Sequence, residues 1–284
     1  MDSSTLFGLT MIAYLLSTAL FIGQLVFRSK TAGTIGYVLA ALGILIQTWG
    51  LGLRWHESYE LGMGHAPLTN MYESLIFFAW STTLFYLLID LKYKVRILGS
   101  FAMPLAFITM AYASLSGHVS ADIKPLLPAL QSNWLIAHVV TCFIGYGAFA
   151  VAAALGCMYL LKKKAGGQGK TLKEADLHLP ALDVLDDLTH KTIIFGFMWL
   201  SAGIITGAIW AAEAWGTYWS WDPKETWSII TWFLYALTLH ARFTKGWRGR
   251  RIAWLAIVGF VAVLFTYFGV NYLLSGLHSY GAPG

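Results

Sequence analysis

Long runs of apolar residues divide the chain, and short polar segments separate one run from the next. Eight runs are long enough, at about 20 residues each, to cross a bilayer as helices. They lie near residues 5–27, 31–53, 71–91, 97–115, 134–161, 191–212, 226–244 and 252–275. None of them shows the alternation of apolar and polar positions that indicates a β-strand. The pattern predicts an all-α, polytopic membrane protein with about eight transmembrane helices.

The composition agrees with lipid as the surroundings of the chain. Hydrophobic residues make up 57% of the 284 positions and charged residues 12%, whereas a soluble domain carries about 25% charged residues. No cationic segment precedes the first apolar run, so we do not expect a cleaved signal peptide. We treat residues 1–284 as a single integral-membrane domain. In such a protein the net charge of +5 reflects the loops, so we expect no nucleic-acid partner.

Positive charges orient the predicted bundle. Sixteen of the nineteen Lys and Arg residues fall in alternate loops, on one side: Arg28, Lys30, Lys92, Lys94, Arg96, Lys162, Lys163, Lys164, Lys170, Lys173, Lys191, Arg242, Lys245, Arg248, Arg250 and Arg251. Cytoplasmic loops carry the excess of Lys and Arg, so we expect both termini and the segment 213–227 on the outer, non-cytoplasmic side. Residues 162–190 then form a cytoplasmic loop. Its Leu182, Leu185 and Leu188 predict a short amphipathic helix at the membrane surface.

The stretch WGTYWSWDPKETW, which begins at Trp215, is unusually rich in indole. It contains four tryptophans, two carboxylates and one lysine. An aromatic belt at the membrane interface accounts for one or two of these tryptophans, and a planar aromatic ligand accounts for all four. If the stretch is partly helical, Trp215, Trp219 and Asp222 share one face. Pro223 suits the first turn of the next helix, with Asp222 near the cap position and Glu225 in the first turn.

Three of the eight histidines occupy positions suited to metal ligation. His138 lies about one turn into the fifth run and His278 just past the eighth, so both are expected on the outer side. Iron in a porphyrin takes axial ligands, and imidazole is a common one. His240 lies toward the inner end of the seventh run, where an ionisable residue is either functional or reaches the interface. About 22 Å of helix separates Cys142 from Cys157, which excludes a disulfide between them.

Several stretches of the chain resemble one family. WGTYWSWDPKETWSIITW resembles the tryptophan-rich WWD signature of cytochrome c assembly proteins that handle haem. GIITGAIWAAEA before it, FLYALTLHAR after it and FGVNYLLSGLHSY near the C-terminus are similar to one branch, the CcsA/ResC type of System II cytochrome c synthesis. HAPLTNMYESL, at residues 65–75, also fits this branch. The family-like core therefore covers about residues 65–284.

The resemblance implies a role for each matching residue. It implies that His138 and His278 ligate haem iron at the outer face. It also implies that His240 ligates a transmembrane haem, whose opposite ligand comes from a partner subunit of the CcsB/ResB type. In the WWD segment it implies the following catalytic and porphyrin-holding residues: Trp215, Trp219, Trp221, Asp222, Glu225 and Trp227.

The resemblance further implies the reaction and its partners. The chain is expected to be a haem-handling subunit of a holocytochrome c synthase (haem lyase) complex. That complex presents reduced haem b to the CxxCH segment of an unfolded apocytochrome c, whose thiols add across the vinyl groups to form thioethers. Thiol-reducing proteins are further expected partners, and the bacterial inner (plasma) membrane is the expected location. Haem propionates are anionic, so either Lys224 or Arg54 is a candidate to pair with one; the alternative is that both are interfacial anchors.

Two functions of other classes remain open from the sequence. One is a HemX-like membrane regulator of haem biosynthesis, which shares the eight-span plan but acts through a soluble enzyme. The other is a b-type haem electron carrier, which needs ligand pairs on its own spans at two depths. Coexpression with the partner subunit and a CxxCH acceptor separates the three, because only a synthase subunit yields covalently bound haem.

Overall fold

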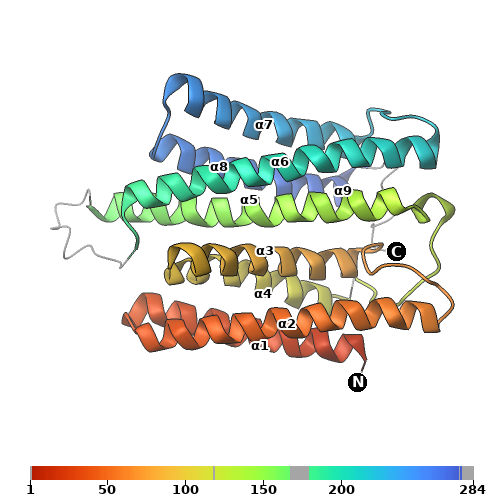
Figure 1. Ribbon diagram of the computed structural model, residues 1–284, viewed down its shortest axis with the longest axis horizontal. Coiled ribbons are helices and arrows are strands. Elements are labelled where there is room, and N and C mark those ends of the chain that lie inside the picture. The colour runs from red at the N-terminus through yellow and green to blue at the C-terminus, as the bar shows by residue number, and fades with distance from the viewer. Residues whose placement is uncertain (1, 118, 167–178, 275, 277–284) are drawn as a thin grey trace.

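The computed structural model describes residues 2–117, 119–166, 179–274 and 276, and its long helices run along one common direction (Figure 1). The helices are α1 (Ser3–Phe27), α2 (Lys30–Glu60), α3 (Met71–Tyr93), α4 (Gly99–Leu115), α5 (Asn133–Gly166), α6 (Leu182–Trp215), α7 (Pro223–Lys245), α8 (Arg250–Leu264) and α9 (Val270–Leu273). Two 3₁₀ turns, η1 (Arg96–Leu98) and η2 (Pro128–Leu130), precede α4 and α5, and a π-helical turn, η3 (Phe265–Gly269), joins α8 to α9. The described residues contain no strand, which confirms the all-α prediction.

Polar caps explain where the first three helices begin. The side chains of Asp2, Ser29 and Asn70 each accept a hydrogen bond from a backbone N–H in the first turn of α1, α2 and α3. Such a cap satisfies an N–H group that has no partner inside the helix, and it contributes about 1 kcal/mol. The short polar segments between the apolar runs therefore set the helix boundaries.

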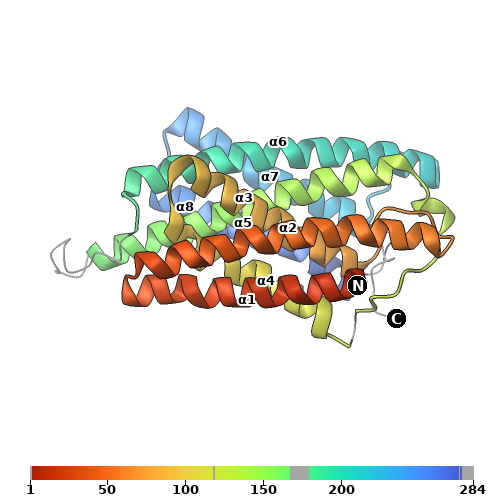
Figure 2. The same ribbon diagram turned by 60° about the horizontal axis from the view of Figure 1, so that its bottom comes forward.

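The helices pack in layers around α5 (Figures 1 and 2). α1 and α2 form one outer pair, α3 and α4 lie next to them, and α6, α7 and α8 cover the opposite side. The most apolar stretch of α5 is 78% buried and that of α3 is 67% buried, against 33% for α2 and 28% for α6. The core therefore lies around α3 and α5, and the outer helices present apolar surface to lipid.

Seven helical stretches within the described residues are long and apolar enough to cross a membrane. They are α1, α2, α3, η1 with α4, α5, α6, and α8 through α9. The predicted run at 226–244 also forms a helix, α7, which lies beside α6 and α8 in both views. Threonines, aromatic residues and charges at both ends make α7 less apolar than the others. The chain is thus a polytopic integral-membrane protein.

The prediction of a separate surface helix at residues 182–188 is wrong. Leu182, Leu185 and Leu188 belong to the first two turns of α6, and the last two are buried. The carboxylate of Asp186 between them accepts a hydrogen bond from Arg242 of α7 at 2.7 Å. This ion pair and the buried leucines hold the turn against the rest of the bundle, so α6 is continuous there.

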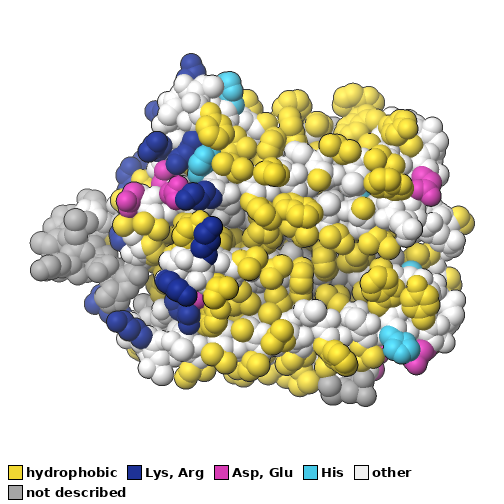
Figure 3. Space-filling model, in the orientation of Figure 1, with side chains coloured by type: hydrophobic (Ala, Val, Ile, Leu, Met, Phe, Trp, Pro, Cys, Tyr) yellow, Lys and Arg dark blue, Asp and Glu magenta, His cyan; other side chains and the backbone are white. Residues whose placement is uncertain are grey.

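The two ends of the bundle differ in charge (Figure 3). Lys and Arg side chains gather at the end where α1 meets α2, α3 meets α4 and α7 meets α8, which we call the basic end. The opposite end carries the start of α1, the connection between α6 and α7, and α9, and we call it the tryptophan end. This separation follows the alternate cationic loops of the sequence. The side of the membrane that each end faces stays a prediction.

Candidate functional site

A cavity opens among α3, α5, α6, α7 and the α8–α9 region at the tryptophan end. It holds about 1200 Å³ of empty space, its mouth included. Apolar side chains form much of its wall: Leu135, Val139, Phe143, Leu200 and Ile204. Polar side chains also line it: Ser74, His138, Tyr146, Lys224 and Asn271. This lining suits a bulky, mainly apolar ligand that has a few polar groups.

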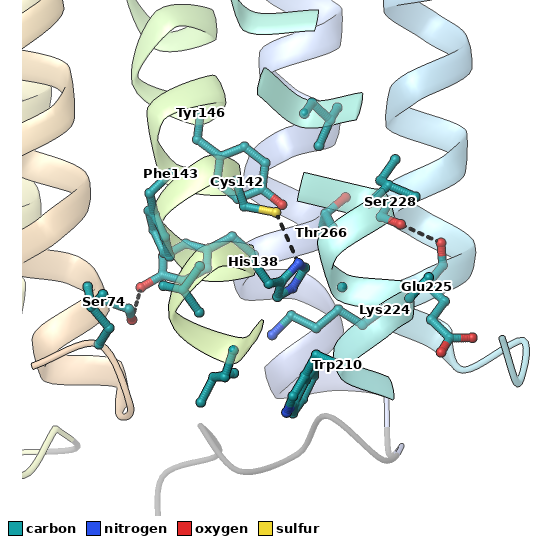
Figure 4. Close-up of a pocket in the computed structure, with 18 of the residues that line it drawn as sticks. Ser74, His138, Cys142, Phe143, Tyr146, Trp210, Lys224, Glu225, Ser228 and Thr266 are labelled. Carbon is teal, nitrogen blue, oxygen red and sulfur yellow. Dashed lines mark hydrogen bonds between the residues drawn. The ribbon is translucent and has the colours of Figure 1, made fainter. Parts of the chain in front are cut away.

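His138, in the second turn of α5, points into the cavity (Figure 4). Its Nδ1 lies 2.7 Å from the carbonyl oxygen of Gly203 on α6. A carbonyl oxygen only accepts, so in the neutral imidazole Nδ1 carries the proton and Nε2 carries the lone pair. Histidines that bind metals are usually oriented by such a hydrogen bond from the other ring nitrogen. His138 therefore has the tautomer that coordinates a metal through Nε2.

Two glycines of α6 make room for this arrangement. A Cβ atom added to Gly207 would lie 2.5 Å from His138 Nδ1, and one added to Gly203 would lie 2.6 Å from Cys142 Sγ. The two glycines are four residues apart, the spacing that lets transmembrane helices approach closely. Without a side chain at Gly207, the imidazole fits between α5 and α6.

Trp210 forms the cavity wall beside His138. Its ring is nearly parallel to the imidazole, at 15° with the ring centroids 6.0 Å apart. Its indole N–H donates to the carbonyl oxygen of Ala129 at 2.8 Å, and the side chain is 2% exposed. Trp215 packs edge-on against it, with centroids 4.8 Å apart. Trp210 is thus a fixed aromatic part of the cavity wall next to His138, and Trp215 supports it from behind.

The connection between α6 and α7 is not helical. Trp221 has a φ of 60°, a left-handed conformation that residues other than glycine rarely adopt. Trp215, Trp219 and Asp222 therefore do not share one helical face, which was the expectation for a partly helical stretch. Trp219 lines the cavity, whereas Trp221 is 73% exposed. The two rings meet edge to face at 5.8 Å, so Trp221 supports Trp219 from the side.

Asp222 and Glu225 build the start of α7, as predicted. Asp222 is the N-cap, and its carboxylate accepts the Lys224 N–H at 3.0 Å. The Glu225 carboxylate accepts the N–H of Asp222 at 3.2 Å and that of Ser220 at 2.8 Å. This reciprocal pattern is a capping box, and Pro223 occupies the first turn. Both carboxylates are buried, and they hold the backbone that presents the cavity wall.

Hydrogen bonds order the polar side of the cavity. Lys224 Nζ donates to Asn271 Oδ1 at 2.9 Å, and the hydroxyls of Ser74 and Tyr267 lie 2.6 Å apart. Tyr267 belongs to the π-helical turn η3, and such turns are frequent at functional sites because they change the helix register. An ammonium group in an otherwise apolar cavity suits a carboxylate of a ligand.

Arg54 lies apart from the cavity lining. Its Nε is 2.8 Å from Glu73 Oε1, and the two side chains are only 2% and 1% exposed. It also donates to the carbonyl oxygen of Ala121 at 2.8 Å. Glu73 in turn accepts the N–H of Thr69 at 2.9 Å, and Thr69 lines the cavity. Arg54 therefore holds Glu73 in place, and Glu73 in turn fixes the cavity wall at Thr69.

Three further residues of the predicted site are not among the described residues that line the cavity. His240 is exposed on α7, on the same face as the exposed Phe233 and Leu237. Trp227 packs against Phe265 of η3, with ring centroids 4.2 Å apart, and is not among the cavity residues. His278 lies outside the described residues. Of the predicted site, the structure brings together His138, Trp219, Lys224 and Glu225 around the cavity, with Trp215 behind Trp210.

Sequence reasoning missed three residues of this site. Trp210 and Gly207 lie in GIITGAIWAAEA, where two glycines four apart and a tryptophan signal close helix packing. Asn271 is an amide within an apolar run, and polar groups inside a membrane are costly and usually functional. Within the described residues no three His, Cys, Asp or Glu side chains cluster around a metal position.

Comparisons with known proteins show the family of the chain. The family model described as Cytochrome C assembly protein matches residues 68–278. Cytochrome c biogenesis protein CcsA of Guillardia theta is 40% identical over 292 residues, which cover 96% of this chain and 95% of that protein. Cytochrome c biogenesis protein CcsA of Parasynechococcus marenigrum is 40% identical over 274 residues, which cover 89% and 88%.

A solved structure shares the fold. Cytochrome c Heme Lyase CcmF superposes with a TM-score of 0.69 over 98% of this chain, at 19% identity. The chain spans 48% of that longer protein, and at this identity the likeness shows the fold alone. The family model and the two relatives show the family of the chain as well, because they match most of its sequence. The chain belongs to the cytochrome c assembly protein family and has a role in cytochrome c biogenesis.

Proposed function

We propose that the chain is a haem-handling subunit of a cytochrome c synthase, and that its cavity holds haem while the haem is attached to apocytochrome c. One observation carries this proposal. The hydrogen bond from His138 Nδ1 to the carbonyl oxygen of Gly203 fixes the ring and places the lone pair on Nε2. His138 lines a cavity that has indoles on its wall and Lys224 on its polar side. Haem is the substrate in this reaction, not a resident cofactor.

The cavity suits each part of haem. Iron needs an axial nitrogen, which His138 supplies, and the flat macrocycle needs apolar and aromatic walls, which Trp210 and Trp219 provide. The propionates need a cation, and Lys224 is the one within reach. Of the two cations expected in this role we retain Lys224, because the guanidinium of Arg54 is paired with Glu73.

The rest of the WWD segment serves the same site in two ways. Trp215 and Trp221 support the indoles that line the cavity, and Trp227 fixes α7 against the π-helical turn. Asp222 and Glu225 hold the start of α7 through the capping box. We infer that the two carboxylates position the reacting groups and that the indoles lining the cavity, Trp210 and Trp219, contact haem.

His278 is our proposed second axial ligand. Gly276, two residues before it, lies against the WWD segment, because a Cβ added there would meet Asp222 Oδ1 at 2.2 Å. Gly276 therefore lies beside the WWD segment that we propose to hold haem, two positions before His278 in the sequence.

His240 serves a second haem position in this proposal, on the way from the basic end. Its imidazole is exposed on a face of α7 that otherwise carries apolar side chains. An ionisable group facing lipid is costly, and such groups usually find a partner. A CcsB/ResB-type subunit packed on this face would supply the opposite ligand.

The reaction needs no nucleophile from this chain. Each thiol of the CxxCH acceptor adds across one vinyl group of reduced haem b, forming one C–S and one C–H bond without net oxidation. Thiol-reducing proteins keep the acceptor ready for this step. The tryptophan end then faces the outer side of a bacterial inner membrane and the basic end faces the cytoplasm, as the distribution of cations favours.

Coexpression of the chain with a CcsB/ResB-type subunit and a CxxCH acceptor tests the proposal. We expect the acceptor to carry haem that survives denaturation, and we expect none when the acceptor sequence is AxxAH. Bound haem without covalent transfer would favour an electron carrier. Absence of haem from the purified complex would favour a regulator and contradict the proposal.

A further inference from the structure

A second hollow, which we call the side groove, lies at the tryptophan end next to the cavity. One side is formed by the end of α2 and the loop after it, with Trp55, Tyr59 and residues 62–66. The other side is formed by residues 125–136, and Glu213 of α6 lies at its edge. The groove holds about 1340 Å³ of empty space, its opening included.

The side groove and the cavity share a wall. Leu68, Thr69, Leu130 and Leu135 line both. A ligand in the side groove is therefore separated from a ligand in the cavity by single side chains. An elongated molecule that lies along the groove could place one of its parts at the haem position.

The charge of the side groove is unsuited to a second haem. No Lys or Arg side chain is among its described lining residues. Glu213 lines it, and Glu60 and Asp122 are exposed at the same end of the bundle, against one exposed cation, Lys124. Anionic propionates would be repelled there, whereas a cationic ligand would be attracted.

Its lining matches an extended polypeptide. Gln131 and Asn133 are exposed, and their amides have hydrogen-bonding capacity for backbone groups beside the bond from Gln131 Nε2 to the carbonyl oxygen of Leu126. Trp55 and Tyr59 are 45% and 62% exposed. Such alternation of hydrogen-bonding groups and aromatic surface is typical of grooves that bind extended chains. A lipid tail would not use the amides, and the groove lies at helix ends and loops.

The groove is also held open by its own contacts. The His65 backbone N–H donates to Ser58 Oγ at 2.9 Å, and its Nε2 lies 3.1 Å from the carbonyl oxygen of Lys124 on the opposite side. The Arg54–Glu73 ion pair fixes the shared wall at Thr69. A preformed groove binds an unfolded chain at a lower entropic cost than a groove that must first order itself.

We propose that the side groove binds the acceptor polypeptide, as an extended and preferably cationic segment, and so delivers its thiols to the haem in the cavity. This inference rests on the proposed function. In this inference the side groove selects the acceptor, whereas the haem ligands bind only the haem.

Photocrosslinking tests the binding directly and needs no haem chemistry. A photoreactive residue placed at Gln131, in the complex with the partner subunit, should crosslink a CxxCH peptide that carries flanking lysines. The same residue at Ser4, exposed at the start of α1 and outside the groove, should not. Equal crosslinking at both positions, or crosslinking of Gln131 only to the partner subunit, would overturn the inference.

Charge variants test its consequence for the reaction. Glu213→Lys and Asn133→Lys should each raise the acceptor concentration for half-maximal thioether formation by about fivefold or more, through electrostatic repulsion. The maximal yield and the haem spectrum should stay unchanged, which shows that the variants fold. Ser4→Lys, with a similar added charge, should behave as the wild type. If all variants behave alike, the groove does not bind the acceptor; if the wild type forms no thioether at all while Gln131 crosslinks the peptide, the proposed function fails and the groove stands.

Discussion

The two well-placed histidines on described residues have opposite surroundings. His138 is enclosed by its own chain: Gly203 fixes its tautomer, Gly207 makes room for it and Trp210 flanks it. His240 lies on an exposed apolar face of α7. The first site is assembled by one subunit, and the second needs a surface that another subunit must supply.

This difference extends to the two ends of the bundle. At the tryptophan end the Arg54–Glu73 ion pair is almost completely buried, with 2% and 1% of the side chains exposed. At the basic end the Arg242–Asp186 pair is 10% and 11% exposed, and the Lys191–Asp187 pair is 54% and 52% exposed. Of these pairs, the one with both side chains almost fully buried thus lies at the end that carries the candidate site.

The largest effect is expected from the two histidines themselves. In the chain purified without a partner, His138→Ala should abolish the absorption of bound haem, because the axial ligand is lost, and His240→Ala should leave it unchanged. The reduced-minus-oxidised spectrum measures both. Added imidazole should restore the His138→Ala spectrum, since it occupies the position of the missing ring.

The same pair of variants tests the role of the partner. In the complex, His240→Ala should lower the haem content of the outer site, because delivery past α7 fails. Loss of haem from His240→Ala in the isolated chain would contradict the comparison and place both histidines in one site.

The buried ion pair should have the next largest effect. Arg54→Ala leaves Glu73 buried without its cation, which costs about 3–5 kcal/mol, whereas Lys191→Ala removes an exposed pair and should leave the free energy of unfolding nearly unchanged. Thermal unfolding in detergent, followed by tryptophan fluorescence, shows which of the two variants loses more stability. The double variant Arg54→Met with Glu73→Leu should recover stability, since no buried charge remains. If it also loses haem, the hydrogen bond from Thr69 to Glu73 is needed to hold the cavity wall.

The helices could be predicted from the sequence because each is a long apolar run between short polar segments. The start of α7 could also be predicted, because its signals are local: the cap Asp222, Pro223 and Glu225 lie within four positions. The surface helix at 182–188 was not foreseen as part of α6, because its ion pair depends on Arg242, far along the chain. Local patterns predict elements, and long-range contacts decide how far they continue.

The candidate site shows the same limit. His138 and the WWD segment stand out by residue type, but nothing local tells which indoles face the cavity. Trp221 is exposed and Trp210 is buried beside His138, a distinction set by the left-handed backbone at Trp221 and by packing of α5 on α6. Arg54 could not be assigned from sequence, because Glu73 lies on another helix.

A smaller effect is expected at Gly207. Gly207→Ala puts a methyl group 2.5 Å from His138 Nδ1, which should shift the ring and weaken haem binding by about tenfold, or about 1.4 kcal/mol. Gly52→Ala is the matched control, because an added Cβ there meets nothing within 4 Å. Haem titration of both variants measures the difference. Equal affinities would show that the α5–α6 contact does not set the ligand position.

The smallest effect is expected at Asp222, and it decides what the carboxylate of the WWD motif does. If Asp222 acts as the N-cap of α7, Asp222→Ala should cost about 1 kcal/mol and speed amide hydrogen exchange in the first turn of α7 by about fivefold. Asp222→Asn keeps a capping oxygen and should retain both the protection and thioether formation, because Asn caps as well as Asp. A capped but inactive Asp222→Asn would mean that the negative charge itself acts on haem or acceptor. The tryptophan end would then contribute chemistry, and not only a shaped and ordered binding site.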